Sequence, residues 1–160
     1  MKKGYLWVFL CAFLLLACQS VPEKTGNLTA QQIAALQAEG FVQDADNWVF
    51  SASDKLLFDS SEAVLRDEAK RTVDRIAAQL IRSGIGAVRV DGHADFTGSR
   101  SQNRALSLRR AEAVAERLRA AGMASEQILV RGLGSDFPVT DNYSDSGKAQ
   151  NRRVVLVVGG

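Results

Sequence analysis

The sequence predicts an α/β (α+β) sandwich in which helices pack on one mixed sheet, preceded by a short helical leader. Helix-like and strand-like hydrophobic patterns alternate along the chain, as they do in folds whose helices cover a sheet. Glycines follow the helical patterns, where they can end a helix. A content of 46% hydrophobic residues in 160 residues, with two prolines, is sufficient for one compact core. One domain with right-handed crossovers is therefore expected.

The N-terminus has the pattern of a secretory signal. Two lysines precede an apolar run over residues 5–17, which is too short for a membrane-spanning helix of about 20 residues. The run ends in Leu-Leu-Ala-Cys, which resembles the lipobox of bacterial lipoproteins. That resemblance implies removal of residues 1–17 and acylation of Cys18, and several acyl chains would anchor the protein stably. Gln19, where an aspartate would resemble an inner-membrane signal, favours the outer membrane; a plain secretory peptide is the alternative.

Processing would also limit the chemistry of the mature chain. Cys11 would leave with the signal and Cys18 would carry lipid, so no free thiol, disulfide or cysteine-based metal site would remain. Loss of Lys2 and Lys3 would bring the formal charge from +2 to about zero. A near-neutral chain is not expected to bind polyanions in general, so nucleic acid is an unsuitable partner.

The first part of the mature chain predicts a tether, a helix and two strand fragments. Residues 18–28 are polar, with a proline and a glycine, and are typical of a flexible tether. Thr29 can cap the next helix, whose Ile33 and Leu36 share one face before Gly40 ends it. Two strand fragments are expected at residues 47–50 and 55–58, on either side of a Ser-Ala-Ser-Asp turn.

The remainder alternates more clearly between helices and strands. A helix that ends at Gly84 has apolar residues at intervals of three and four, and a second helix is expected from about residue 101 to 121. Strands are expected at residues 87–92, 127–134 and 152–158, with a long loop before the last one.

Three stretches in this second part carry a family resemblance. They are VDGHADFTG at residues 90–98, NRALSLRRAEAV at 103–114 and GKAQNRRVVLVV at 147–158. Together they resemble the OmpA-like domain, a peptidoglycan-binding module also found in peptidoglycan-associated lipoproteins. The resemblance implies a βαβαβ-type fold, to which we assign residues 56–160. It also implies a non-enzymatic binding function.

The leader, residues 29–55, has a narrower resemblance. Its sequences LTAQQIAALQAEGF and NWVFSASDKLLF, the latter running on to Phe58, are similar to the leader of YfiB-type outer-membrane lipoproteins. These belong to a three-component periplasmic system that governs an inner-membrane diguanylate cyclase and hence c-di-GMP signalling. The resemblance implies that this segment captures a periplasmic repressor of the cyclase. A purely structural tether between wall and outer membrane, with no signalling partner, is the alternative.

The family resemblance also implies which residues bind peptidoglycan. The diaminopimelate of the stem peptide presents an ammonium and a carboxylate on one carbon, so its receptor needs an acid and a base close together. Asp95 matches the family acid that binds the ammonium, and Arg110 matches the arginine that can donate two hydrogen bonds to the carboxylate. Asn103 and Gly98 match residues that hold the stem peptide and let the backbone approach it.

Three positions depart from the family pattern. Ala94 stands where a threonine is usual, Phe96 where a polar residue is common, and Ser61 where an asparagine often occurs. Backbone contacts at Ala94 could survive, so it stays among the expected binding residues. Lost hydroxyl and amide contacts are expected to lower the affinity.

Other roles for the charged residues are weaker. A zinc site needs three or four ligands, and the mature chain would offer one histidine, His93, and no free cysteine. A metal bound by His93 with Asp91 and Asp95 is the minor alternative. No nucleophile with a base and no paired acids are recognisable, so we expect no catalytic residue, no metal and no cofactor. His93 is expected to order its turn by hydrogen bonding. Arg152 and Arg153, which open the last strand, are expected to be structural.

Three aromatic residues of the leader have two interpretations. Trp48 and Phe50 lie two apart in a strand-like segment and share a face, and Phe41 is nearby. They either pack in the core, as aromatic residues usually do, or form an apolar patch that a periplasmic partner covers. The sequence does not indicate the oligomeric state and is compatible with a homodimer.

Overall fold

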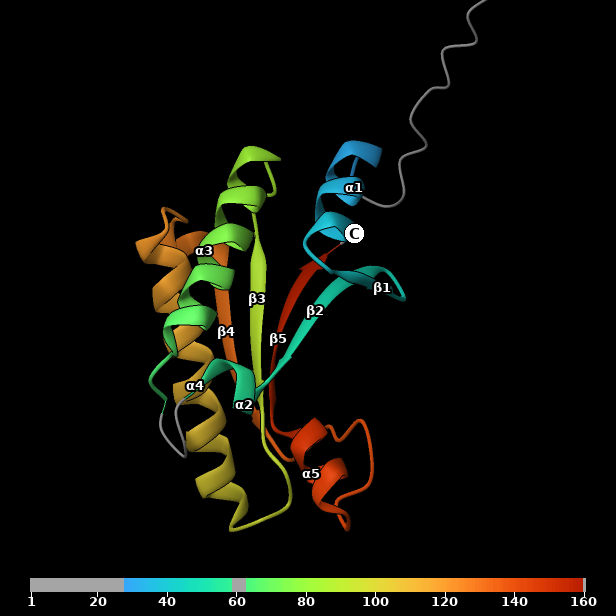
Figure 1. Ribbon diagram of the computed structural model, residues 1–160, viewed down its shortest axis with the longest axis vertical. Coiled ribbons are helices and arrows are strands. Elements are labelled where there is room, and N and C mark those ends of the chain that lie inside the picture. Colours follow the sequence, from blue (N-terminus) through green and yellow to red (C-terminus); the bar gives the residue numbers. More distant parts are fainter. Residues whose placement is uncertain (1–27, 59–62, 160) are drawn as a thin grey trace, which may run out of the picture.

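The computed structural model describes residues 28–58 and 63–159 (Figure 1). Its centre is a five-stranded mixed sheet in the order β1-β2-β5-β3-β4, in which β3 and β4 are parallel and the other neighbours antiparallel. The strands are β1 (Val42–Asp44), β2 (Asn47–Ser53), β3 (Val88–His93), β4 (Ile128–Gly134) and β5 (Arg153–Gly159). The predicted class, helices packed on a mixed sheet after an N-terminal helix, is confirmed.

Two long helices cover the sheet. The helices are α1 (Ala30–Ala38), α2 (Asp54–Leu57), α3 (Asp67–Arg82), α4 (Arg100–Ala120) and α5 (Asp145–Asn151), with a 3₁₀ turn at Ser125–Gln127. Helix α4 packs on β3 and β4, α3 packs on α4, and α1 contacts α3. Between these layers lie the fully buried side chains of Leu36, Ile76, Leu80, Val90, Val114, Leu118 and Val158. Among the residues described, no helix is both long and apolar enough to cross a membrane.

The close fit of α4 on the sheet depends on glycine. A Cβ at Gly92 would lie 2.0 Å from the Ser107 carbonyl oxygen, and one at Gly132 would lie 2.5 Å from the Leu108 Cβ. Any larger residue would push the helix away from the strands. These two glycines therefore set the distance between α4 and the strands β3 and β4.

Side-chain caps fix where two of the helices begin. Thr29 accepts a hydrogen bond from the Gln32 backbone, and the Gln32 side chain accepts one from the Thr29 backbone. Ser99 and Gln102 form the same reciprocal capping box at the start of α4. Such caps satisfy N–H groups that have no partner within the helix.

The predicted turn at residues 51–54 is wrong. Strand β2 continues through it, pairing Ser51 with Val155 and Ser53 with Arg153, and the expected second strand fragment is instead the helical turn α2. The reason is tertiary: pairing along the whole of β5 outweighs the turn preference of the serines. The edge strand β1 was not predicted. Neither was α5, which lies in the expected long loop and begins where Ser144 accepts a hydrogen bond from the Gly147 backbone.

Candidate functional site

The expected binding residues meet at one end of the sheet. β2 and β3 end there and β5 begins there, and Figure 1 shows α2, α5 and the first turns of α4 around them. Asp95 lies two residues after the end of β3, Arg110 lies in α4, and both are buried, at 6% and 5% exposed. The structure therefore brings together two residues that the sequence separates by a loop and half a helix.

Asp95 is held by hydrogen bonds on both carboxylate oxygens. Its Oδ1 accepts from the Thr97 backbone at 2.8 Å, and its Oδ2 accepts from Nη1 of Arg152 at 2.7 Å. The Asn103 amide donates to the Asp95 carbonyl oxygen at 2.9 Å. Ala94, also buried, donates its backbone N–H to the Gly134 carbonyl oxygen at 2.8 Å. Asn103 and Ala94 thus fix the loop that carries the acid.

Arg110 has fewer partners than its burial demands. Its Nη1 donates to Oδ2 of Asp54 over 3.4 Å, and its guanidinium carbon lies 5.3 Å from the centroid of the Phe58 ring. Its Nε is buried and has no hydrogen-bond partner. A guanidinium has five donors, so this group has unused capacity for an acceptor such as a carboxylate.

Two residues of this site were missed by sequence reasoning. Arg152 donates from Nε to Oδ2 of Asp54 at 2.9 Å as well as to Asp95, so it joins the two acids. Asp54, expected in a turn, thereby completes a charge cluster of two acids and two arginines: Asp54, Asp95, Arg110 and Arg152. The structural role expected for Arg152 is therefore incomplete. Arg153 fits that role, since it donates to the carbonyl oxygens of Asn151 and Phe137.

Asp95 and Arg110, the two expected ligand-binding residues of the charge cluster, are ionised at neutral pH. Burial by itself raises the pKa of the Asp95 carboxyl, but hydrogen bonds from Arg152 and Thr97 more than offset burial, so the pKa lies below its ordinary value. Burial lowers the pKa of Arg110, Asp54 raises it, and Arg152 lowers it further. An arginine nevertheless keeps its proton. Two opposite charges are thus available to a ligand.

The loop after Asp95 shows why the family glycine is retained. Gly98 has a φ of +89°, in the left-handed region that favours glycine. Phe96, the departure from the family pattern, is 58% exposed, and its backbone N–H donates to the Asn142 side chain at 3.1 Å. Ser61, Cys18 and the tether before Leu28 lie outside the described residues, so the predictions for them stay predictions.

The expectation that His93 orders its turn by hydrogen bonding is not met at Nδ1. The residue is 7% exposed and its Nδ1 is buried without a hydrogen-bond partner. Burial, followed by the charge of Arg153, lowers its pKa to about 4. Within residues 28–58 and 63–159, no group of three or more His, Cys, Asp or Glu side chains could hold a metal ion.

The three leader aromatics do not form an exposed patch. Phe41 and Trp48 are buried, at 2% and 5% exposed, and belong to the core. Phe50 is partly buried, with its ring centroid 5.6 Å from that of Phe41. The structure thus favours the core interpretation for Phe41 and Trp48, and leaves Phe50 as the aromatic residue that a partner can reach.

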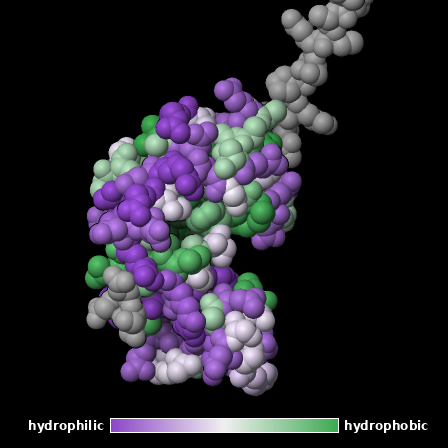
Figure 2. All heavy atoms as spheres, in the orientation of Figure 1, coloured by the Kyte–Doolittle hydropathy of each residue, from purple (hydrophilic) through white to green (hydrophobic). Residues whose placement is uncertain are grey.

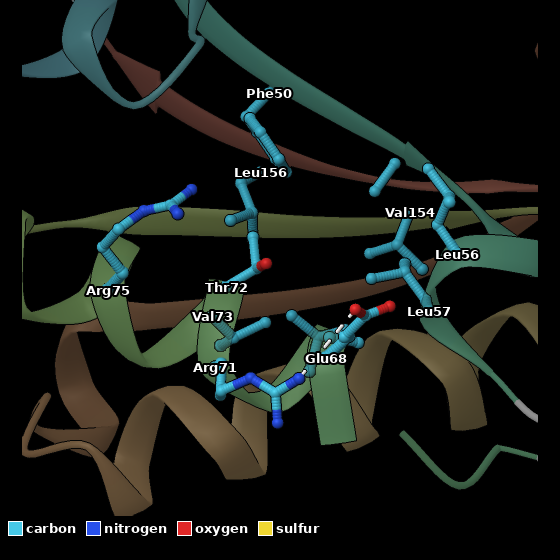
Figure 3. Close-up of a pocket in the computed structure, with 13 residues that line it drawn as sticks. Phe50, Leu56, Leu57, Glu68, Arg71, Thr72, Val73, Arg75, Val154 and Leu156 are labelled. Carbon is cyan, nitrogen blue, oxygen red and sulfur yellow. Dashed lines mark ion pairs between the residues drawn. The ribbon is translucent and has the colours of Figure 1, made fainter. Parts of the chain in front are cut away.

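Phe50 lines an apolar groove between β2, α2 and α3. The groove has a volume of about 580 Å³, and Figure 3 shows Phe50, Val73 and Leu156 directed into the same space as Leu57 and Val154. Its rim is charged, with Glu68, Arg71 and Arg75 on α3. Figure 2 shows hydrophobic side chains gathered across the middle of this face, with polar surface above and below.

Comparisons with known proteins agree with this geometry. The model of the OmpA family matches residues 57–152. The outer-membrane lipoprotein YfiB of Pseudomonas aeruginosa is 43% identical over 144 residues, which cover 90% of this chain and 85% of that protein. A YfiB lipoprotein of Escherichia coli is 36% identical over 148 residues, covering 92% of this chain and 91% of that protein.

Solved structures show the same fold. The cell wall anchor of the T6SS from Pseudomonas aeruginosa superposes with a TM-score of 0.67 at 31% identity, covering 82% of this chain and 96% of that one. The peptidoglycan-associated lipoprotein of Burkholderia pseudomallei gives a TM-score of 0.58 at 29% identity, covering 64% and 86%. The family and the narrower resemblance are therefore confirmed. The chain belongs to the OmpA family, a non-enzymatic binding family, and within it to the outer-membrane lipoproteins of the YfiB type.

Proposed function

We propose that this protein binds peptidoglycan non-covalently through the diaminopimelate of the stem peptide and so links the wall to the outer membrane. The observation that supports the proposal best is the charge cluster, in which buried Asp95 and Arg110 carry opposite charges at one end of the sheet. Two of the similar proteins are named as a cell wall anchor and a peptidoglycan-associated lipoprotein, which points to the same ligand.

The chemistry of the cluster suits one end of diaminopimelate. Arg110 has spare donors for the carboxylate. The two carboxylate oxygens of Asp95 accept hydrogen bonds from Thr97 and Arg152 and have further lone pairs for the ammonium. Charge-assisted hydrogen bonds of this kind contribute about 1.5–3 kcal/mol each. Ala94 can offer only backbone groups, so the affinity should be lower than in relatives with a hydroxyl there.

Calorimetry with a diaminopimelate-containing stem peptide tests this proposal. Asp95→Ala and Arg110→Ala should each weaken binding at least about tenfold, the effect of losing one charge-assisted contact. Arg109→Ala is the matched control, because Arg109 is adjacent in α4 but exposed. Equal affinity of all four proteins would show that the charge cluster does not bind the stem peptide.

We also propose that the leader side of the domain captures a periplasmic repressor of a diguanylate cyclase, as the YfiB resemblance implies. The specific support is the apolar groove beside Phe50, because grooves of this size lined by aliphatic and aromatic side chains suit an apolar segment of a protein partner. In this arrangement Phe41 and Trp48 hold the strand from within, and Phe50 contacts the partner.

Pull-down of the purified repressor tests the second proposal. Phe50→Ala should reduce capture, while Leu129→Ala should not, since Leu129 is an exposed hydrophobic residue on β4, outside the groove. Thermal unfolding of both variants would show whether reduced capture reflects loss of the fold. If folded Phe50→Ala captures the repressor as well as the wild type does, Phe50 is not a contact. If the wild type captures none, a purely structural tether is favoured.

A further inference from the structure

Asp54 lies in the charge cluster although none of the matched stem-binding motifs includes it. It is the first residue of α2, directly after β2, and its side chain is 12% exposed. Its Oδ2 receives both guanidiniums, from Arg152 at 2.9 Å and from Arg110 at 3.4 Å. Its Oδ1 is buried and has no hydrogen-bond partner. One carboxylate thus sets where two arginines lie.

The backbone around Asp54 is fixed as firmly as its side chain. Its N–H donates to the Arg152 carbonyl oxygen at 2.9 Å, and its own carbonyl oxygen accepts from the Phe58 N–H at 2.8 Å. Phe58 is the residue whose ring lies against the Arg110 guanidinium. Asp54 is therefore attached to Arg110 directly and through Phe58, and to Arg152 by side chain and backbone.

The charges show what Asp54 does for the two arginines. Arg110 and Arg152 are like charges that share one oxygen, so they are held close only while the carboxylate lies between them. Among the described residues, Arg110 has no ion-pair partner other than Asp54, whereas Arg152 also has Asp95. Without the Asp54 charge, Arg110 would lose its anchor, and Arg152 would turn fully to Asp95 and occupy the acid expected to take the ligand's ammonium.

We propose that Asp54 is a positioning residue of the stem-peptide site. It holds Arg110 where this arginine can bind the ligand's carboxylate, and by sharing Arg152 it keeps that arginine from pairing with Asp95 alone, so that Asp95 can still accept the ligand's ammonium. The inference rests on the proposed binding of the diaminopimelate stem. It assigns to Asp54 no contact with the ligand, since the residue acts through the two arginines. The site then comprises four charged residues from four segments of the chain.

Asp54→Asn, tested with two ligands, separates positioning from a general effect on the fold. One ligand is the stem peptide with the free diaminopimelate carboxylate, and the other is the same peptide with that carboxylate amidated. Wild type should prefer the free carboxylate at least about tenfold, since one charge-assisted contact is lost on amidation. In Asp54→Asn the preference should fall to about threefold or less, together with weaker binding of the free form. A folding defect would lower the active fraction for both ligands equally and leave their ratio unchanged.

Asp74→Asn is the matched control. Asp74 on α3 also pairs with an arginine of α4, Arg117, but far along the helix from the charge cluster, so its loss should leave the ligand preference at the wild-type value. A wild-type preference retained in Asp54→Asn would overturn the role of Asp54 while leaving the proposed function intact. Equal binding of the two ligands by wild type would overturn the carboxylate recognition itself, and the role of Asp54 with it.

Discussion

His93 should make the stability of this protein depend on pH in a defined window. The folded state holds the imidazole at 7% exposure, and burial followed by the charge of Arg153 lowers its pKa to about 4. In the unfolded chain the same group has a pKa near its ordinary value of 6.5. As the pH falls below 6.5, His93 binds a proton in the unfolded chain but stays neutral in the folded state. Stability from this group is therefore present above 6.5 and is lost progressively down to about 4.

The size of the effect follows from the two pKa values. One pH unit across this window corresponds to about 1.4 kcal/mol, so the free energy of unfolding should fall by about 2.5 kcal/mol between pH 7.5 and pH 4.5 because of this one side chain. That loss is a large part of the stability of an ordinary domain, about 5–15 kcal/mol. Carboxylates that titrate below their usual range, such as Asp95, lose their contribution only at lower pH.

Urea unfolding of wild type and His93→Gln at the two pH values measures this contribution. The variant cannot titrate at this position, so all other groups cancel when the two pH dependences are subtracted. Wild type should lose about 2.5 kcal/mol more than the variant on acidification. Equal losses in the two proteins would refute the reasoning and would mean that the folded state accepts the proton on His93 without penalty.

Two further predictions concern the packing that positions the site. Gly92→Ala should cost about 3 kcal/mol or more, since the added Cβ would lie 2.0 Å from the Ser107 carbonyl oxygen. Gly86→Ala, whose Cβ would meet only the end of a glutamine side chain at 4.0 Å, should change the urea midpoint little. Asn151→Ala should cost about 2–4 kcal/mol, because this buried side chain bonds the backbone at Val139, Thr140 and Asp141; a loss below about 1 kcal/mol would contradict that role.

The periodic part of the fold could be predicted from the sequence because its signals are local. Helix α3 repeats apolar residues at intervals of three and four and ends at Arg82, two residues before Gly84, whose φ is +65°. Local sequence signals gave a wrong prediction at residues 51–58. There the serines favour a turn, but pairing with β5 extends β2, and only the partner strand determines that outcome. Helix α5 was missed because its Asp-Ser-Gly start has the composition of a loop.

The candidate site was predicted in part for a similar reason. Asp95, Arg110 and Asn103 are found in the family motifs, and the structure places all three at the same end of the sheet. Arg152 was missed because we expected it to be part of the last strand, where the side chains of Arg152 and Arg153 would face opposite sides. It instead precedes β5 and is the C-cap of α5, with a ψ of 95°. Asp54 carries no motif signal, and only the ending of β2 beside β5 brings it to Arg152.

The charge cluster is balanced, and this balance limits the ligand that it can select. The negative charges of the two acids cancel the positive charges of the two arginines, so the cluster as a whole attracts neither anions nor cations. A ligand with one charge would leave a buried opposite charge of the cluster without a partner, which is costly in a buried site. A zwitterion replaces ion pairs within the cluster by ion pairs between the cluster and the ligand, so every charge still has a partner of opposite sign. Because Asp95 and Arg110 are buried, the matching is by position rather than by long-range field, and the site is suited to a group that carries both charges on one carbon.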